Sequence, residues 1–362
     1  MFKIFKKRSF RVRVIAIVSL ALFFCLLILF GNHPDAVEHY YSQGLYPVIC
    51  HIFHPVFNIF PFSIGDIVYS LAVIWLIYII VRFIRMLFKR QWEPAGILIL
   101  GVTVGIEIVI AAFYLFWGMN YYRPPASELL NLRDSDYTVA DLRAVTSELI
   151  DSANACRERL DGKDMGQTNK TIYQIAVKAV NQLEDSSSIF RAYHPDIKPS
   201  LLTPLLNYLG TSGYYNPFTS ESQVNFQMPV FTRPFVACHE LSHQMGFAPE
   251  DEANFVGFIA GIHSHDRLLR YSAYNEGVLE FMFALRHQDS IARKELRKRI
   301  SPQVLADFKT EREYWLGYEG RIERISSMFY DSFLKANNQP YGLRTYNRMV
   351  LLILAYRKKH QL

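Results

Sequence analysis

The distribution of apolar residues divides the chain into two parts. Three long apolar runs lie at about 14–31, 64–81 and 95–117. Each run is close to the length that a helix needs to cross a bilayer core roughly 30 Å thick. After residue 119, apolar and charged residues are mixed, and no run is long enough to span. The pattern therefore predicts a membrane region over residues 1–119 and a folded domain over residues 120–362.

Basic residues predict the orientation of the three spans. The first thirteen residues contain six basic residues and no acidic one, and residues 82–90 contain four more. Because basic loops stay in the cytoplasm, we expect a cytoplasmic N-terminus and, outside the cell membrane, residues 32–63 and the whole domain after residue 119. A cleaved signal peptide would begin similarly, but Asn32-His-Pro-Asp35 follows the first run in place of small residues.

The remaining charges argue against a nucleic-acid partner. The net charge is +6, and outside the first thirteen residues the basic and acidic residues are equal in number. The four cysteines form no CxxC pair, so they predict no disulfide framework. Glu107 lies inside the third apolar run, where an interhelical hydrogen bond is a simpler explanation than an intramembrane relay. The bilayer is therefore the partner that this part of the sequence predicts.

The domain after residue 119 shows patterns of helices and one region of strands. Thr138 and Asp141 form a capping-box pattern before a helix to about Leu160. Further helices are predicted at 172–183 and, after Ser301-Pro302, to about Glu319. Residues 213–226 alternate after several turn residues and predict a hairpin or an edge strand. The expected fold class is mainly α, with three transmembrane helices and an α+β domain that contains a small sheet.

Residues 239–243 read His-Glu-Leu-Ser-His and are the candidate metal-binding and catalytic residues of the sequence. Two histidines four positions apart lie on one helix face, where both rings can reach one metal ion. Glu240 then lies beside that ion and can take a proton from a bound water molecule. Pro234 is suited to the first turn of this helix, and Gly246 is suited to its end.

A second acidic segment follows the glycine and could complete the site. Residues 250–257 have the pattern E-x-x-A-N-x-x-G, which is typical of a helix start. Glu250 would complete a His-His-Glu zinc site with the fourth position open to water, and Asn254 could hydrogen-bond a liganding histidine. Two alternatives stay open: Glu252 could be the third ligand, or these acids could merely cap the helix.

These two segments resemble the gluzincin metallopeptidases, which include thermolysin and the membrane-bound prenyl-protease and heat-shock peptidase families. In those proteins the third ligand opens an E-x-x-A/S-D helix, so the resemblance implies a zincin-like domain, Glu250 as a zinc ligand and Asn254 near the ligands. The chain departs from the pattern at two points. Asn254 replaces the aspartate, and only seven positions separate His243 from Glu250, a spacing closer to that of metzincins.

Almost the whole chain resembles an uncharacterised bacterial family of three-span membrane proteins that carry an exported H-E-x-x-H domain. The stretches that carry this resemblance are WGMNYYR, GYYNPFTSESQVN, CHELSHQMGF and EDEANF. The family is labelled a domain of unknown function. The resemblance therefore implies the architecture and leaves the substrate open.

Together these observations predict a membrane-anchored zinc metallopeptidase with one Zn²⁺ per chain, acting on a peptide or protein substrate. Glu240 would deprotonate the metal-bound water and deliver the proton to the leaving amine. The alternative is a non-catalytic envelope scaffold or binding protein, in which further ligands close a structural or vestigial metal site. An oxyanion stabiliser is also expected, and the sequence offers four candidates: His263, His265, Arg344 and Tyr346. The substrate and the oligomeric state are left open.

Overall fold

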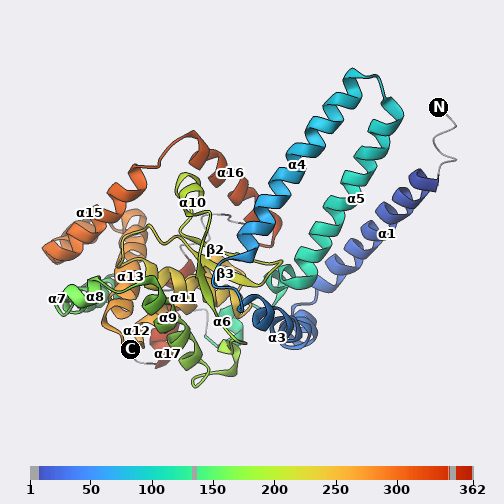
Figure 1. The fold of residues 1–362 in the computed structure, drawn as a ribbon. Coiled ribbons are helices and arrows are strands. Elements are labelled where there is room, and N and C mark those ends of the chain that lie inside the picture. The colour runs from blue at the N-terminus through green and yellow to red at the C-terminus, as the bar shows by residue number, and fades with distance from the viewer. Residues whose placement is uncertain (1–7, 133–136, 341, 343–347, 361–362) are drawn as a thin grey trace. The chain divides into compact units, whose positions relative to one another are not determined.

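The computed structural model describes residues 8–132, 137–340, 342 and 348–360. The chain forms two compact units, each described here by itself. Unit 1 comprises Met1–Ile49, Ile64–Arg123 and Pro217–Thr219, and unit 2 comprises Cys50–Ser63, Pro124–Asn216 and Ser220–Leu362. The described part of the chain is mainly helical with one small sheet (Figure 1), which confirms the predicted fold class.

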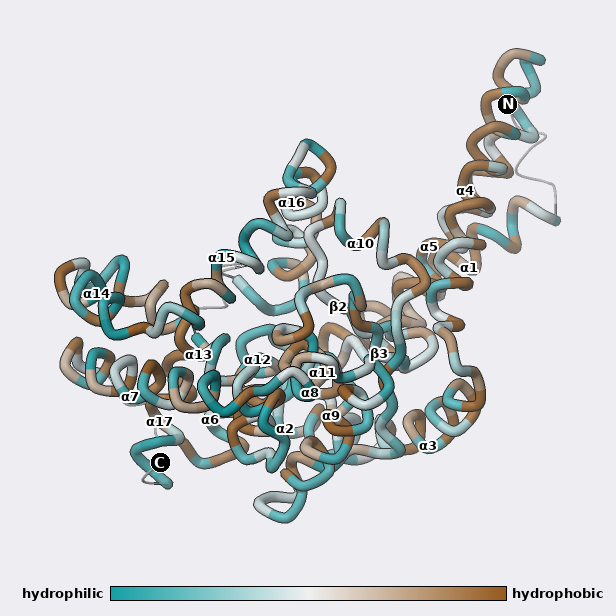
Figure 2. The backbone as a smooth tube through the Cα atoms, turned by 60° about the vertical axis from the view of Figure 1, so that its left-hand side comes forward, coloured by the Kyte–Doolittle hydropathy of each residue, from teal (hydrophilic) through white to brown (hydrophobic). Residues whose placement is uncertain are grey.

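Unit 1 contains three helices that are long and apolar enough to cross a membrane: α1 (Arg8–Gly31), α4 (Ile64–Phe88) and α5 (Trp92–Phe116). The helices α1 and α4 are longer than the predicted spans because backbone hydrogen bonding continues through basic residues at which an apolar run stops. Apolar residues dominate α4 (Figure 2). One carboxylate oxygen of Glu107 on α5, Oε2, is buried without a hydrogen-bond partner among the described residues, and the role of this residue stays a prediction. The shorter elements are α2 (Pro34–Ala36), the π-helix η2 (Val37–Leu45) and the 3-10 helix η3 (Gly118–Tyr122).

The helix α3 (Tyr46–Phe57) runs from unit 1 into unit 2. Residues 50–63 belong to unit 2, although the hydropathy pattern placed them in the membrane region. Hydrogen bonds explain this packing: Asn58 Nδ2 donates to the carbonyl of His194 (3.0 Å), and Lys198 Nζ donates to the carbonyl of Phe57 (2.7 Å). The Lys198 ammonium also forms a buried ion pair with Glu221 at 2.7 Å.

The small sheet of unit 2 has the strand order β1-β3-β2. Strands β2 (Gly213–Asn216) and β3 (Glu221–Val224) are antiparallel and form the predicted hairpin, with Gly213 opposite Val224. Strand β1 (Ile197–Pro199) is parallel to β3, with Ile197 opposite Ser222. The strand β2 therefore lies at an edge of the sheet.

Helices build the rest of unit 2, and three of them confirm sequence predictions. The helix α7 begins with the predicted capping box at Thr138, α9 covers 172–183, and α15 begins after an N-cap at Ser301. The helices are α6 (Ala126–Leu129), α7 (Val139–Glu158), α8 (Gly162–Met165), α9 (Asn169–Leu183), η4 (Ser188–Phe190), α10 (Thr203–Leu209), α11 (Arg233–Gln244), α12 (Glu250–Ile262), α13 (Arg267–Gln288), α14 (Ser290–Arg297), α15 (Pro302–Leu316), α16 (Arg321–Ala336) and α17 (Arg348–His360).

The core of unit 2 is centred on α11 and α12, which pack against each other. Both sit among α9, α13 and the sheet, and α12 is buried from Glu250 to Gly261. At the crossing, Gly257 has no side chain, and a Cβ there would lie 3.0 Å from the backbone nitrogen of His239. Glycine at this position therefore lets the two helices approach closely enough to bring their polar residues together.

Candidate metal centre

The helix α11 presents both histidines of the H-E-x-x-H motif to one point. Pro234 lies in its first turn, and Gly246 follows its end with φ +85°, as the sequence predicted. The rings of His239 and His243 are perpendicular, with centroids 4.8 Å apart. Nδ1 of His243 lies 2.7 Å from the carbonyl of Phe247, so this nitrogen carries the proton and Nε2 is the nitrogen that faces Glu250.

Glu250, the first residue of α12, lies against both rings. One carboxylate oxygen, Oε2, lies 3.3 Å from Nε2 of His239, and the other, Oε1, lies 3.8 Å from Nε2 of His243. Two atoms that bind one tetrahedral Zn²⁺ at about 2.0–2.1 Å lie roughly 3.3 Å apart. The separation of Glu250 from His239 therefore matches that of two ligands of one metal ion, and its separation from His243 is 0.5 Å longer.

Glu240 belongs to α11, and its side chain lies against the small sheet. The ligand atoms of His239, Glu240 and His243 all lie within 4.8 Å of one another. Oε2 of Glu240 is buried and has no hydrogen-bond partner among the described residues, and the Glu240 carbonyl accepts a 2.8 Å hydrogen bond from Ser222 Oγ on β3. The edge strand β2 approaches so closely that a Cβ on Gly213 would lie 2.6 Å from Oε1 of Glu240.

Burial and mutual charge set the ionisation of these groups. Burial alone would raise the pKa of Glu250, but hydrogen bonding to His239 and the charges of both histidines lower this pKa to about 2. Burial alone would lower the pKa of His239, but Glu250 and Glu240 raise it to about 9. Burial lowers the pKa of His243 to about 4 and raises the pKa of Glu240 to about 8.

These residues fit a zinc ion by their chemistry as well as by their spacing. Two imidazole nitrogens and one carboxylate form a donor set that zinc hydrolases use, and it leaves one coordination position open. Without a cation, His239 keeps a proton beside Glu250. A metal ion would take the place of that proton, because ligands bind metals in their deprotonated form.

The acids next to Glu250 are engaged elsewhere. Glu252, the alternative third ligand, accepts a hydrogen bond from the backbone nitrogen of Ala126 at 2.8 Å. Asp251 is buried and lies 3.7 Å from the guanidinium of Arg348. The geometry therefore favours Glu250 over both of its neighbours as the ligand beside the two histidines.

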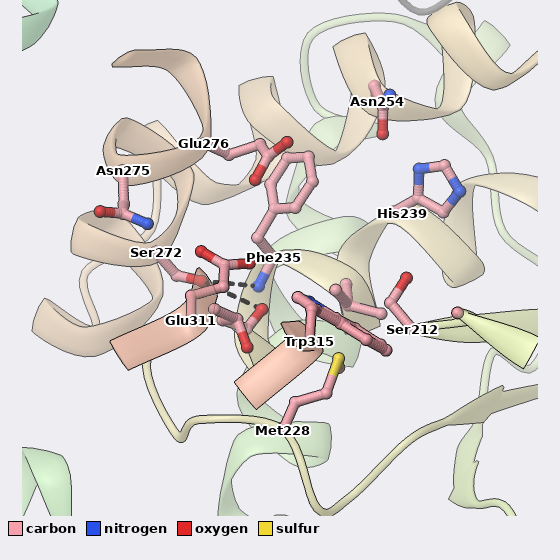
Figure 3. Close-up of a pocket in the computed structure, with 13 residues that line it drawn as sticks. Ser212, Met228, Phe235, His239, Asn254, Ser272, Asn275, Glu276, Glu311 and Trp315 are labelled. Carbon is pink, nitrogen blue, oxygen red and sulfur yellow. Dashed lines mark hydrogen bonds between the residues drawn. The ribbon is translucent and has the colours of Figure 1, made fainter. Parts of the chain in front are cut away.

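Asn254 lies one turn after Glu250 and lines a pocket beside His239 (Figure 3). Its side chain is among the groups that raise the pKa of His239. Nδ1 of His239, however, has no hydrogen-bond partner of normal geometry among the described residues. The predicted hydrogen bond between Asn254 and the free ring nitrogen therefore stays a prediction.

Sequence reasoning missed one residue that contacts the site. The hydroxyl of Tyr330, on α16, donates a hydrogen bond to Oε1 of Glu250. A tyrosine 80 positions away in an amphipathic helix carries no local signal for this contact. Such a bond orients the carboxylate and holds its charge next to the histidines.

A group of three acids on the other side of the pocket was also missed. The pocket has a volume of about 250 Å³, and Glu276 from α13 and Glu311 from α15 extend into it together with His239 (Figure 3). Burial raises the pKa of Glu276 and of its neighbour Glu280, and burial with the charge of Glu276 raises the pKa of Glu311 to about 8. The spacing of Glu276 and Glu280, four apart among apolar residues, could have signalled part of this group.

None of the four candidate oxyanion stabilisers is placed at the site. Arg344 and Tyr346 lie outside the described residues. His263 caps the far end of α12, roughly 20 Å along the helix from Glu250, where its Nδ1 bonds the carbonyl of Ile259. His265 follows that end and does not line the described pocket.

Fold and site together define a mainly helical protein with three helices of membrane length and a buried His-Glu-His group in its second unit. The model of a family described as "Protein of unknown function (DUF3810)" matches residues 41–354. The chain therefore belongs to this family, as the resemblance in sequence implied. No curated protein and no solved structure matches the chain.

Proposed function

We propose that this protein is a membrane-anchored zinc metallopeptidase. The observation that carries the proposal is the convergence of His239, His243 and Glu250 at the separations of one tetrahedral metal site. A zinc ion bound there would polarise a peptide carbonyl and lower the pKa of a water molecule. The three helices of membrane length support anchoring, and the two basic clusters support a cytoplasmic N-terminus with unit 2 outside the cell membrane.

Glu240 is the proposed general base. Its side chain lies with the two histidines, and Oε2 is buried with no described partner, so it is able to accept a proton. Burial raises its pKa to about 8 in the metal-free protein, and a bound cation beside it would favour the ionised form, which takes a proton from water and then gives it to the leaving amine. Ser222 and Gly213 fix this residue against the sheet.

The alternative function is an envelope scaffold with a closed, structural metal site. Such a site needs a fourth protein ligand, and Asp251 and Glu252 are the nearest acids in the sequence. Their contacts with Arg348 and Ala126 argue against either acid as a fourth ligand and therefore favour the enzyme.

A library of peptides of varied sequence tests the function across many candidate substrates at once. We expect the zinc-loaded, detergent-purified parent to generate new peptide termini, detected by mass spectrometry, and Glu240→Gln to generate none while keeping its zinc. The exposed Glu295→Gln on α14 is the control for handling and folding. Cleavage by Glu240→Gln at the parental rate would reject Glu240 as the base, and a zinc-loaded parent without cleavage would favour the scaffold.

A further inference from the structure

Seven of the exposed apolar side chains of unit 2 lie on, or just before, two helices that pack together near the candidate site. On α16 they recur at three- and four-residue spacing, so they share one side of the helix. The helix α10 packs against α16 (Figure 1). It adds exposed apolar residues from its own turns and from the segment just before it. This α10–α16 face consists of Leu201, Leu205, Tyr208, Ile322, Ile325, Met328 and Phe329.

The apolar side chains of this face have exposed fractions that are unusual for a surface in contact with water. Met328 is 71% exposed and Phe329 is 73% exposed, at the centre of the α16 side. The opposite side of α16 is turned inward, where Leu334 is fully buried and Tyr330 reaches Glu250. Contiguous exposed apolar side chains of this kind mark a surface that another apolar phase covers.

The short connections between unit 2 and the helices α4 and α5 indicate that this apolar phase is the lipid bilayer. Ser63 of unit 2 is joined directly to Ile64, the first residue of α4. Pro124 of unit 2 follows Phe116, the last residue of α5, by only eight positions. Because α4 and α5 are long and apolar enough to lie in a bilayer, these two short connections keep unit 2 at the bilayer surface whichever side of the membrane it occupies.

Charge on α16 fits a lipid surface as well. Arg321 and Arg324 are exposed and follow one border of the apolar side, and Lys335 on the same border forms an ion pair with Asp331 at 2.6 Å. An amphipathic helix with basic residues beside its apolar side lies in the headgroup region, where the basic groups meet lipid phosphates. Aromatic rings add to this fit, since Tyr208 packs against Tyr318 at the edge of the face.

We propose that the α10–α16 face is a membrane-binding surface, which lies in the headgroup region of the bilayer that holds α4 and α5. The pocket reaches this face, because Gly210 and Ser212 line it just beyond α10 and Tyr330 of α16 contacts Glu250. If the proposed peptidase function also holds, on which this last step rests, the site takes peptide segments held at the membrane surface.

Fluorescent labels on the full-length protein test the membrane surface without any turnover. In a Cys25→Ala background, because the other three cysteines are buried, Met328→Cys and Ile291→Cys each receive an NBD label. Ile291 on α14 is 70% exposed and is a matched control for Met328. Both proteins are reconstituted into phosphatidylcholine–phosphatidylglycerol vesicles, with and without lipids that carry a doxyl quencher near the headgroup.

We expect the label at 328 to emit at shorter wavelength than the label at 291, and to be quenched several-fold more by the doxyl lipid. Equal, water-like emission and equal weak quenching at both positions would overturn the proposal. A label at 328 that is blue-shifted but insensitive to doxyl lipid would also overturn it, in favour of a protein that covers the face. These readings are independent of zinc and of cleavage, so they separate a failure of the membrane surface from a failure of the peptidase.

Discussion

Two groups of acids lie near His239, and they differ in the side chains that surround them. Glu250 has an imidazole within 4 Å of each of its oxygens and a hydrogen bond from Tyr330, and its pKa is lowered to about 2. Glu276, Glu280 and Glu311 have no ion pair with a described residue, and the pKa of each is raised. Glu250 is the most deeply buried of these acids and is nevertheless ionised, because its charged neighbours outweigh its burial, whereas burial dominates for the three half-buried acids and favours their protonated form.

The difference indicates where a divalent cation would bind. A metal ion needs ionised or neutral donors that converge from several directions, and the nitrogen atoms of His239 and His243 provide this beside Glu250. Among the three other acids, Glu276 repels Glu280 and Glu311, and none of the three forms an ion pair with a described histidine. Four substitutions test this difference between the two groups of acids, taken in decreasing order of their expected effect.

Glu240→Gln removes the proposed base and leaves the three ligand side chains in place. We expect turnover to fall by about 10²–10⁴-fold, the range for loss of general acid–base catalysis. The measurement is kcat on the best peptide from the library, with zinc content determined on the same sample. Loss of zinc together with turnover would show instead that Glu240 holds the metal.

Tyr330→Phe removes one hydrogen bond from the carboxylate of Glu250 and leaves its two imidazole neighbours unchanged. We expect zinc affinity to fall by about tenfold, the lower end of the range for residues that orient a ligand. Competition with a chelator measures the affinity, and Tyr208→Phe on the exposed α10 is the control. Unchanged affinity would mean that the two histidines alone orient Glu250.

Gly213→Ala places a methyl group against Oε1 of Glu240 and 2.7 Å from the carbonyl oxygen of Gln223. Because the neighbouring backbone must shift, we expect kcat to fall by up to about tenfold, the order set by a small displacement of a catalytic group, while zinc binding is retained. Gly162→Ala, where a Cβ meets nothing within 4 Å, is the matched control. Full activity in Gly213→Ala would show that strand β2 does not position the base.

Glu311→Gln tests the group of Glu276, Glu280 and Glu311 through its effect on the thermal stability of the protein. The folded pKa of Glu311 is raised from 4.5 to about 8, so its contribution to stability is present below pH 4.5 and is lost as the pH rises through 8. We expect the thermal midpoints of variant and parent to agree near pH 4.5 and the variant to be higher by about 2–4 °C at pH 8.5, equivalent to roughly 1 kcal/mol.

Glu313→Gln, on the same helix but exposed, is the control and should show no such change with pH. A Glu311→Gln variant that is less stable than the parent at pH 8.5 would contradict the comparison. It would mean that this group of acids holds a cation in the folded protein.

The sequence predicted the parts of the site that lie within one helix turn. His239, Glu240 and His243 are set by spacing alone, and the turn chemistry of Pro234 and Gly246 defined the helix that carries them. The three membrane-length helices and the hairpin are equally local patterns. Their existence was predicted, and the ends of α1 and α4 were not, because charged residues continue a helix that hydropathy would stop.

Other parts depend on contacts between distant segments. The choice between Glu250 and Glu252 could not be made from two acids in the same helix turn, because it depends on the crossing at Gly257 and on the backbone nitrogen of Ala126. Tyr330 reaches Glu250 from 80 residues away. Strand β1 was not predicted, since three residues that pair with β3 carry no alternating pattern of their own.

The zinc content per chain decides whether His239, His243 and Glu250 form a metal site. We expect about one zinc per chain in the detergent-purified parent and in Glu252→Gln, with strong loss in His239→Ala and Glu250→Gln, by elemental analysis. Loss in Glu252→Gln but retention in Glu250→Gln would move the third ligand. A parent that binds no zinc even after reconstitution would contradict the account and leave the scaffold as the function to test.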